Sequence, residues 1–329
     1  MADQTAIIHS LLEELTLRGA FSGAVLLTKQ GETILSSGYG MADVEQGIPN
    51  TSKTKFRIGS VTKSFTAAAV LQLVSQDRIG LDDPIGPYFP RQTGGGRITI
   101  RHLLNHTSGL PNYTDNPLMM EWVQHDASPE EVAARFCFKE LDFEPGSQFT
   151  YCNSGYVLLG LLMEKLTGKS YSEIIRDHLL EPLGMKSTEV EISFKEDSLF
   201  ATGYEYDGAH TLVKAPFFHA SNAYAAGSIL STVEDLLLWD YGLETNTILS
   251  KTLTEQMFTA GGPSIPYGFG WFIQNTPFGT MIQHSGGVTG FYSLFMKFPQ
   301  SKVTIIILSN IAQDVIKTGK ELAAILHKE

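Results

Sequence analysis

Cysteine, charge and long apolar runs are all scarce in this chain of 329 residues. Cys137 and Cys152 are its two cysteines, too few for the disulfide framework that holds small secreted domains together. We expect both to be reduced and partly buried, because a free cysteine behaves as a small hydrophobic residue. No apolar run is long enough to cross a bilayer, so no membrane span is expected.

The start of the chain also lacks the features of a secretory leader. Residues 2–18 mix acidic and apolar residues at helical spacing, with neither a basic start nor an apolar centre. The prediction is a soluble protein that stays in the cytoplasm, or a secreted one if a leader has been removed.

Charged residues make up 18% of the chain and carry a net charge of −11. Repulsion from phosphates argues against nucleic acid as a partner. Hydrophobic residues make up 43%, enough for a sizeable core, so disorder over most of the chain is not expected.

Motifs of several enzyme classes are missing. There is no Gly-x-Ser-x-Gly, no phosphate-binding loop and no complete dinucleotide fingerprint. His102 and His106 lie four residues apart on a predicted helix, but position 103 is leucine and no third ligand is evident. We therefore expect no metal and no cofactor.

The chain begins and ends with strand patterns, and helix patterns fill its middle. Expected strands are 23–29, 33–39, 268–274, 280–284, 293–298 and 303–308. Expected helices are 7–18, 65–74, 100–105, 129–138, 156–166, 171–180 and 315–327, with Gly168 and Gly184 as C-caps.

This order predicts an α/β (α+β) fold with a mostly antiparallel sheet, flanked by terminal helices and interrupted by an inserted all-α domain. Residues 1–80 and 210–329 would form the α/β domain, and residues 81–209 the helical one. Domain interfaces are common places for ligand sites, so we expect the active site in the cleft between them.

Ser60 and Lys63 are the first candidates for chemistry. Three residues are nearly one helical turn, so both side chains share a face, and a lysine with a lowered pKa can remove the proton of a serine nucleophile. Ser52 and Lys55 have the same spacing, but they lie in a polar loop with no apolar helix behind them. A simple N-cap role for Ser60 remains the alternative at this point.

Two further elements favour the catalytic interpretation. Tyr151 can act as a base or pass a proton to a leaving group, and Asn153, two residues on, can orient a substrate. His284 is followed by Gly286 and Gly287 near a strand end, where a substrate backbone can approach and a Gly287 amide can complete an oxyanion hole with that of Ser60. Among the aromatic residues, loop position favours Tyr113 and Tyr292 as pocket residues.

The ordered set Ser-x-x-Lys, Tyr-x-Asn and His-x-Gly resembles the three motifs of the serine penicillin-recognising enzymes. It is most similar to their class C β-lactamase-like branch, which includes DD-peptidases, D-amino-acid peptidases and amidases, low-molecular-weight penicillin-binding proteins and family VIII esterases. Further stretches resemble the same group: 21–25, 56–60, 81–84, 100–110, 181–185 and 267–271.

The resemblance implies that Ser60 forms an acyl-enzyme, that Lys63 and Tyr151 share the proton transfers, that Asn153 binds the substrate amide, and that His284 and Gly286 line the opposite wall. Which of Lys63 and Tyr151 takes the first proton is left open. Many β-lactamases of this branch have a lysine at position 284, whereas histidine is mostly neutral at pH 7.

We therefore expect a peptidase acting on D-residues or an esterase, with poor β-lactam turnover. Three alternatives are a penicillin-binding or regulatory protein that β-lactams acylate at Ser60, with little turnover, a weak β-lactamase, and a non-enzymatic binding protein of the same fold. The expected partner is a small-molecule or peptide substrate, and the oligomeric state is open.

Overall fold

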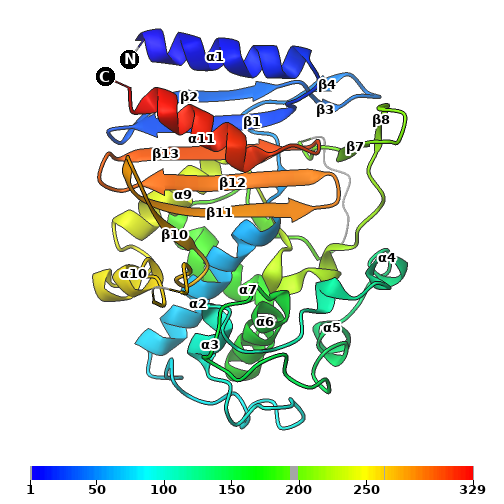
Figure 1. The fold of residues 1–329 in the computed structure, drawn as a ribbon, viewed down its shortest axis with the longest axis vertical. Helices are drawn as coiled ribbons and strands as arrows, with labels where there is room; N and C mark the ends of the chain where they lie inside the picture. Colours follow the sequence, from blue (N-terminus) through cyan, green and yellow to red (C-terminus); the bar gives the residue numbers. More distant parts are fainter. Residues whose placement is uncertain (1, 193–198, 263, 329) are drawn as a thin grey trace.

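A six-stranded antiparallel sheet is the largest element of the computed structural model, which describes residues 2–192, 199–262 and 264–328. Its strand order is β10-β11-β12-β13-β1-β2. The strands are β1 (Gly23–Lys29), β2 (Glu32–Tyr39), β10 (Phe272–Thr276), β11 (Gly279–Val288), β12 (Phe291–Phe298) and β13 (Val303–Ser309). Because β1 pairs with β13 along its whole length, both ends of the chain build one sheet (Figure 1).

Both faces of this sheet are buried. On β13, Ile305 and Ile307 belong to one apolar cluster, whereas Ile306 and Leu308 belong to another, as the alternation of side chains along a strand requires. Helices α1 (Ala2–Leu17) and α11 (Val315–Leu326) cover the first face, and α9 (Val233–Glu244) packs on β1 and β13 from the second (Figure 1).

The lower half of the molecule in Figure 1 is mostly helical. At its centre, α2 (Thr62–Ser75) packs against α6 (Asn153–Thr167), and both are buried over most of their surface. The other helices are α3 (Ile100–Leu104), α4 (Met119–Trp122), α5 (Pro129–Ala134), α7 (Tyr171–Ile175), α8 (Glu181–Leu183) and α10 (Lys251–Met257). No helix in the described part of the chain has the length and apolar character that a membrane crossing requires.

Short strands form three smaller sheets, β3-β4, β5-β9-β6 and β7-β8. They are β3 (Met41–Asp43), β4 (Ile48–Pro49), β5 (Phe56–Arg57), β6 (Glu189–Val190), β7 (Tyr204–Tyr206), β8 (Leu212–Lys214) and β9 (Ile229–Ser231). Strand β9 pairs with both β5 and β6, so the chain just before Ser60 is held next to the segment that leaves the helical half. Residues 56–58 look strand-like in the sequence, and β5 lies there; the other short strands have only two or three residues, too few for a recognisable pattern.

The predicted fold class is confirmed, and Gly168 and Gly184 do cap helices in the left-handed conformation, with φ of 72° and 69°. The domain boundaries at residues 81 and 209 stay a prediction.

Several predicted element boundaries were wrong. Helix α5 ends at Ala134, short of residue 138, and a π-helix (η3, Arg176–Leu180) replaces the second half of the helix predicted for 171–180. The strand predicted for 268–274 begins only at Phe272, because the chain before it turns at Gly270, where φ is +80°. Strand β11 continues through the glycines to Val288, so these glycines lie within a strand and not in a turn after it.

Candidate active site

Ser60 lies on a single 3₁₀ turn, η1 (Gly59–Val61), that runs directly into α2. The chain enters this turn through Gly59 at φ +48°, a conformation that favours glycine. In a 3₁₀ turn, residues three apart stand above one another. The turn therefore places the side chain of Lys63 directly beside that of the partly exposed Ser60.

The ammonium group of Lys63 is fully buried, and each of its three protons has an acceptor. Its Nζ lies 3.0 Å from Ser60 Oγ, 2.8 Å from Asn153 Oδ1 and 2.8 Å from the carbonyl oxygen of Ala226. None of these acceptors is a carboxylate, so burial dominates and lowers the pKa of Lys63 to about 7. Near pH 7 a large fraction of Lys63 is a neutral amine next to the serine hydroxyl.

Tyr151 lies on the other side of the lysine, with its ring centroid 5.0 Å from Lys63 Nζ. Its hydroxyl is buried and lacks a hydrogen-bond partner of regular geometry. Burial raises the pKa of Tyr151, and the nearby Ser60 side chain opposes this only in part. The phenol is therefore neutral at ordinary pH, and its proton is available for donation.

Asn153 begins α6 and is held on both sides of its amide. Its Oδ1 accepts from Lys63, and its Nδ2 donates to Thr114 Oγ1 at 3.0 Å. The carbonyl oxygen is thus fixed toward the lysine.

His284 lies inside β11 and is 1% exposed. Its Nδ1 lies 2.6 Å from the carbonyl oxygen of Ser285 and so carries the proton, which leaves Nε2 to accept from the Tyr267 hydroxyl at 2.9 Å. Burial, and then the charge of Lys63, lower the pKa of His284 to about 3. The imidazole is neutral with both nitrogens occupied, so it offers no cation to a substrate carboxylate.

Gly286 and Gly287 bring β11 against the serine turn. A Cβ on Gly286 would lie 2.1 Å from the carbonyl oxygen of Ile58, and a Cβ on Gly59 would lie 2.9 Å from the backbone nitrogen of Gly287. Only glycines allow this approach of the two backbones.

The strand next to this turn has a free edge. The pairs Thr276–Gly279 and Val288–Phe291 close the two-residue hairpin turns at either end of β11. With alternating hydrogen-bonded pairs, the N–H and C=O groups of Gly287 point away from β12. They point to the side on which β10 lies, but the pairing of β10 with β11 goes no further than Phe272 and Gln283. The N–H and C=O groups of Gly287 are therefore open to an extended ligand.

The two aromatic pocket candidates are placed elsewhere. Tyr113 is 3% exposed and donates its hydroxyl to the carbonyl of Asn222 at 2.6 Å, so its ring belongs to the core. Tyr292 packs with the α1 and α11 side of the sheet. Its neighbour Phe291 points to the opposite face, as the alternation along β12 requires.

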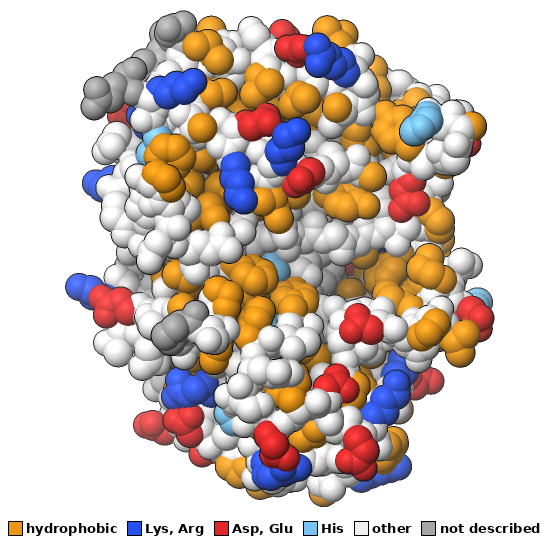
Figure 2. Space-filling view, in the orientation of Figure 1, with side chains coloured by type: hydrophobic (Ala, Val, Ile, Leu, Met, Phe, Trp, Pro, Cys, Tyr) orange, Lys and Arg blue, Asp and Glu red, His pale blue; other side chains and the backbone are white. Residues whose placement is uncertain are grey.

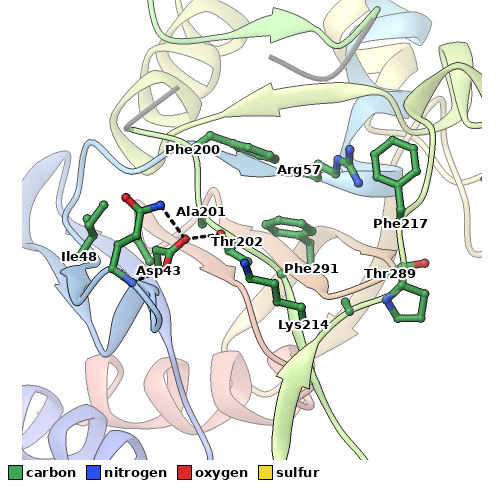
Figure 3. A pocket seen from close by; sticks show the side chains of 15 residues that line it. Asp43, Ile48, Arg57, Phe200, Ala201, Thr202, Lys214, Phe217, Thr289 and Phe291 are labelled. Carbon is green, nitrogen blue, oxygen red and sulfur yellow. Dashed lines mark hydrogen bonds between the residues drawn. The ribbon is translucent and has the colours of Figure 1, made fainter. Parts of the chain in front are cut away.

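Phe291 lines a cavity of about 540 Å³ that sequence reasoning did not find. Figure 3 shows Phe291 and Phe200 facing it from different segments, with Arg57 and Phe217 nearby. The two phenylalanine rings stack 5.6 Å apart. The lining comes from five short segments that only tertiary folding brings together, so no local pattern could reveal it. Figure 2 shows that the visible face is also hollowed at mid-height, between the sheet and the helices.

The remaining sequence candidates have structural contacts. His102 takes part in the N-terminal cap of α3 with Thr99, and His106 Nδ1 accepts from the backbone of Cys152 at 3.1 Å. Cys137 and Cys152 are both free. Within residues 2–192, 199–262 and 264–328, no group of three or more His, Cys, Asp or Glu side chains is arranged to hold a metal ion.

Comparison with known proteins shows which family the chain belongs to. The model of the Beta-lactamase family matches residues 8–327, almost the whole chain. The chain belongs to the beta-lactamase family. It is 31% identical to penicillin-binding protein 4* of Bacillus subtilis over 326 residues, which cover 93% of this chain and 72% of that protein.

Solved structures of this family have the same fold. The octameric penicillin-binding protein homologue from Pyrococcus abyssi is 32% identical with a TM-score of 0.85, covering 98% of this chain and 78% of that one. The D-amino acid amidase from Ochrobactrum anthropi SV3 is 27% identical with a TM-score of 0.86, covering 98% and 99%. Three curated relatives are longer, and the chain spans 72%, 64% and 76% of them.

Proposed function

We propose that this chain is a serine hydrolase that forms a covalent acyl-enzyme on Ser60, with Lys63 as the base that removes the first proton. The observation that carries the proposal is the buried Lys63 amine, 3.0 Å from Ser60 Oγ and with a pKa of about 7. A base with a pKa close to the working pH combines a useful neutral fraction with adequate proton affinity.

The contacts favour Lys63 over Tyr151 for this first step. A tyrosine must be ionised to act as a base, and burial opposes ionisation of Tyr151. As a neutral phenol with an unoccupied hydroxyl, Tyr151 fits the second proton transfer, to the leaving group. In the first step Ser60 Oγ bonds to the substrate carbonyl carbon and its proton moves to Lys63 Nζ. In the next, the bond to the leaving nitrogen or oxygen breaks as that atom takes the Tyr151 proton, which Lys63 replaces.

The backbone around this centre supports an extended substrate. The free edge of β11 at Gly287 can pair with a peptide backbone, as in strand addition to a sheet. The Gly287 amide, beside the Ser60 turn, is one of two donors that we assign to the oxyanion, the Ser60 amide being the other.

His284 supports a proposal for the substrate class. Because this imidazole is neutral and both its nitrogens are occupied, a β-lactam carboxylate would find no cation there. We infer that the substrates are amides or short peptides with a D-residue, or small esters, and that β-lactams are turned over poorly. The similarity to the D-amino acid amidase from Ochrobactrum anthropi SV3 supports the amide class.

The test is a substrate panel with intact-mass measurement. It contains D- and L-phenylalanine amide, a D-alanyl-D-alanine peptide, p-nitrophenyl acetate and benzylpenicillin. We expect hydrolysis of a D-amide or an ester, together with an acyl mass increment on the tryptic peptide that contains Ser60. Long-lived penicilloylation without hydrolysis of any amide or ester would instead favour a penicillin-binding protein with little turnover.

A further inference from the structure

A second cavity, of about 410 Å³, lies behind the segment that holds the catalytic lysine. Its walls come from the starts of α5 and α7, the C-terminal part of α6, the chain around β6, and the turns η4 (Ala220–Asn222) and η5 (Tyr224–Ala226). Four of its lining residues are acidic, and none of those described is Lys, Arg or His. The acidic residues are Asp126, Glu131, Glu164 and Glu191.

Three of these carboxylates already have partners. Glu191 is held by Arg57 through two hydrogen bonds, of 2.8 and 2.6 Å. Glu131 caps α5 at Ser128, and the exposed Asp126 lies 3.5 Å from His219.

Glu164 is different. Its Oε1 accepts from the backbone nitrogen of Tyr171 at 2.7 Å, but no ion pair involves it among the described residues. Among the four acidic side chains of the cavity, it is the one whose described contacts include neither a cation nor a histidine nor a side-chain cap.

Two buried hydroxyl groups also lie in the cavity wall, and that of Tyr224 is close enough to Glu164 for the carboxylate, after burial, to raise the tyrosine pKa. The Oη of Tyr224 and the Oγ of Ser228 make no hydrogen bond of regular geometry, although these residues are only 8% and 3% exposed. The ring of Tyr224 is closely packed. A Cβ on Gly160 would lie 2.5 Å from the Tyr224 ring, and Tyr171 packs on its other side at 5.1 Å. Unsatisfied buried hydroxyls carry a free-energy cost that a ligand can remove.

We propose that this cavity binds a primary ammonium group carried on an aliphatic chain. An ammonium has three donors and no acceptor, which matches the Glu164 carboxylate and the two hydroxyl oxygens. Apolar lining by Ala127, Pro129 and Val190 suits the methylene groups. A divalent metal fits less well, because the described residues form no metal-type cluster.

The site is next to the catalytic lysine by way of η5. Tyr224 begins this turn, and Ala226, which ends it, supplies the carbonyl oxygen that accepts from Lys63 Nζ. The carbonyl of Ala225 accepts from Thr66 on α2 at 2.7 Å. Tyr224 thus lies in the same turn as the carbonyl group that accepts from Lys63, and the proposed binding does not depend on the proposed hydrolase function.

Isothermal titration calorimetry with 1,5-diaminopentane on the full chain tests the proposal. We expect saturable one-to-one binding that weakens with added salt, and no binding of the neutral 1-pentanol. A second titration uses Nα-acetyl-lysine amide, which represents the lysine side chain of a peptide. Binding of both ligands indicates that the cavity accepts the ammonium chain of a free amine or of a peptide. Binding of only one ligand shows which of these two sources the cavity recognises.

Glu164→Gln removes the free charge and is expected to weaken binding roughly tenfold or more. Glu140→Gln, at an exposed position outside the cavity, is the matched control and should stay within about twofold. If Glu164→Gln does not fold, Tyr224→Phe with Ser228→Ala keeps the charge and removes both acceptors, and it too should weaken binding. Equal affinity of wild type and these variants, or no saturable binding by wild type, overturns the proposal.

Discussion

Two Ser-x-x-Lys pairs lie eight residues apart in this chain, and they behave in opposite ways. Ser60 and Lys63 are 3.0 Å apart on one turn. Ser52 Oγ instead donates to Glu234 at 2.7 Å, and Lys55 Nζ donates to Glu189 at 3.2 Å. The same spacing thus gives a coupled pair in one place and two separate surface contacts in the other.

The backbone explains the difference. Ser60 is on a 3₁₀ turn that continues into α2, so the side chains of Ser60 and Lys63, three residues apart, lie on the same face. Ser52 is in a turn, and by Lys55 the chain has become extended, so the two side chains diverge. A spacing motif carries chemistry only where the backbone between its residues is helical and the surroundings exclude water.

Replacing each serine gives the largest expected contrast. Ser60→Ala removes the proposed nucleophile and should lower kcat/KM for p-nitrophenyl acetate or a D-amide by about 10³-fold or more. Ser52→Ala should leave the same rates within about twofold, because an exposed serine–carboxylate contact contributes little. Equal loss in both variants, with both proteins folded by circular dichroism, contradicts the assignment.

Lys63 and Lys55 should differ in their effect on the pH dependence of kcat/KM, because only Lys63 is the proposed base. Burial lowers the pKa of Lys63 to about 7, so only the deprotonated form above that pH accepts the serine proton. The rate should rise about tenfold per pH unit below 7 and level off above it. Because the pKa of His284 is about 3, this histidine should add no limb between pH 5 and 9.

The control is Lys55→Ala, which should keep this profile. Lys63→Ala should lose the limb and about 10²- to 10⁴-fold of the rate. A wild-type profile that is flat from pH 5 to 9 while chemistry is rate-limiting would mean that Lys63 is not the base.

Two neighbouring ion pairs, on β5 and the segments next to it, differ in the same way: one is buried and the other is more exposed. Arg57 and Glu191 are 8% and 4% exposed, whereas Lys55 and Glu189, two residues earlier on each segment, are 15% and 47% exposed. Glu191→Gln leaves a buried guanidinium without its charge partner and should lower the free energy of unfolding by about 3–5 kcal/mol.

Glu189→Gln is the matched change at the surface and should cost about 0–1 kcal/mol. Urea unfolding at pH 7, followed by fluorescence and circular dichroism, measures both variants. Similar midpoints for the two would show that burial does not decide the strength of these pairs.

The sequence allowed the strand-rich ends and the central apolar helix to be predicted, because each depends on residues close together in the chain. The three motifs could be found for the same reason, and their catalytic role stays a proposal. Pocket residues depend on which way a side chain points. Tyr292 and Phe291 are adjacent, yet only Phe291 faces the cavity, and the face is set by the register of β12 against its neighbours. Tyr113 was expected at a pocket because its segment is a loop, but that loop is held inside by Ser154 and Asn222. Neither contact is visible in a local pattern.

Two adjacent glycines give the smallest expected effect and the finest test of the serine turn. A Cβ on Gly286 would lie 2.1 Å from the Ile58 carbonyl oxygen, whereas a Cβ on Gly287 would meet nothing within 4 Å. Gly286→Ala must push β11 away from η1, so we expect a loss of about 1–3 kcal/mol in the free energy of unfolding and a fall in kcat. Gly287→Ala should leave the melting temperature nearly unchanged, because its methyl group enters open space. The free edge of β11 and the serine turn are in contact only if the two variants differ in this order, since a strand that merely ends near the site would tolerate either alanine.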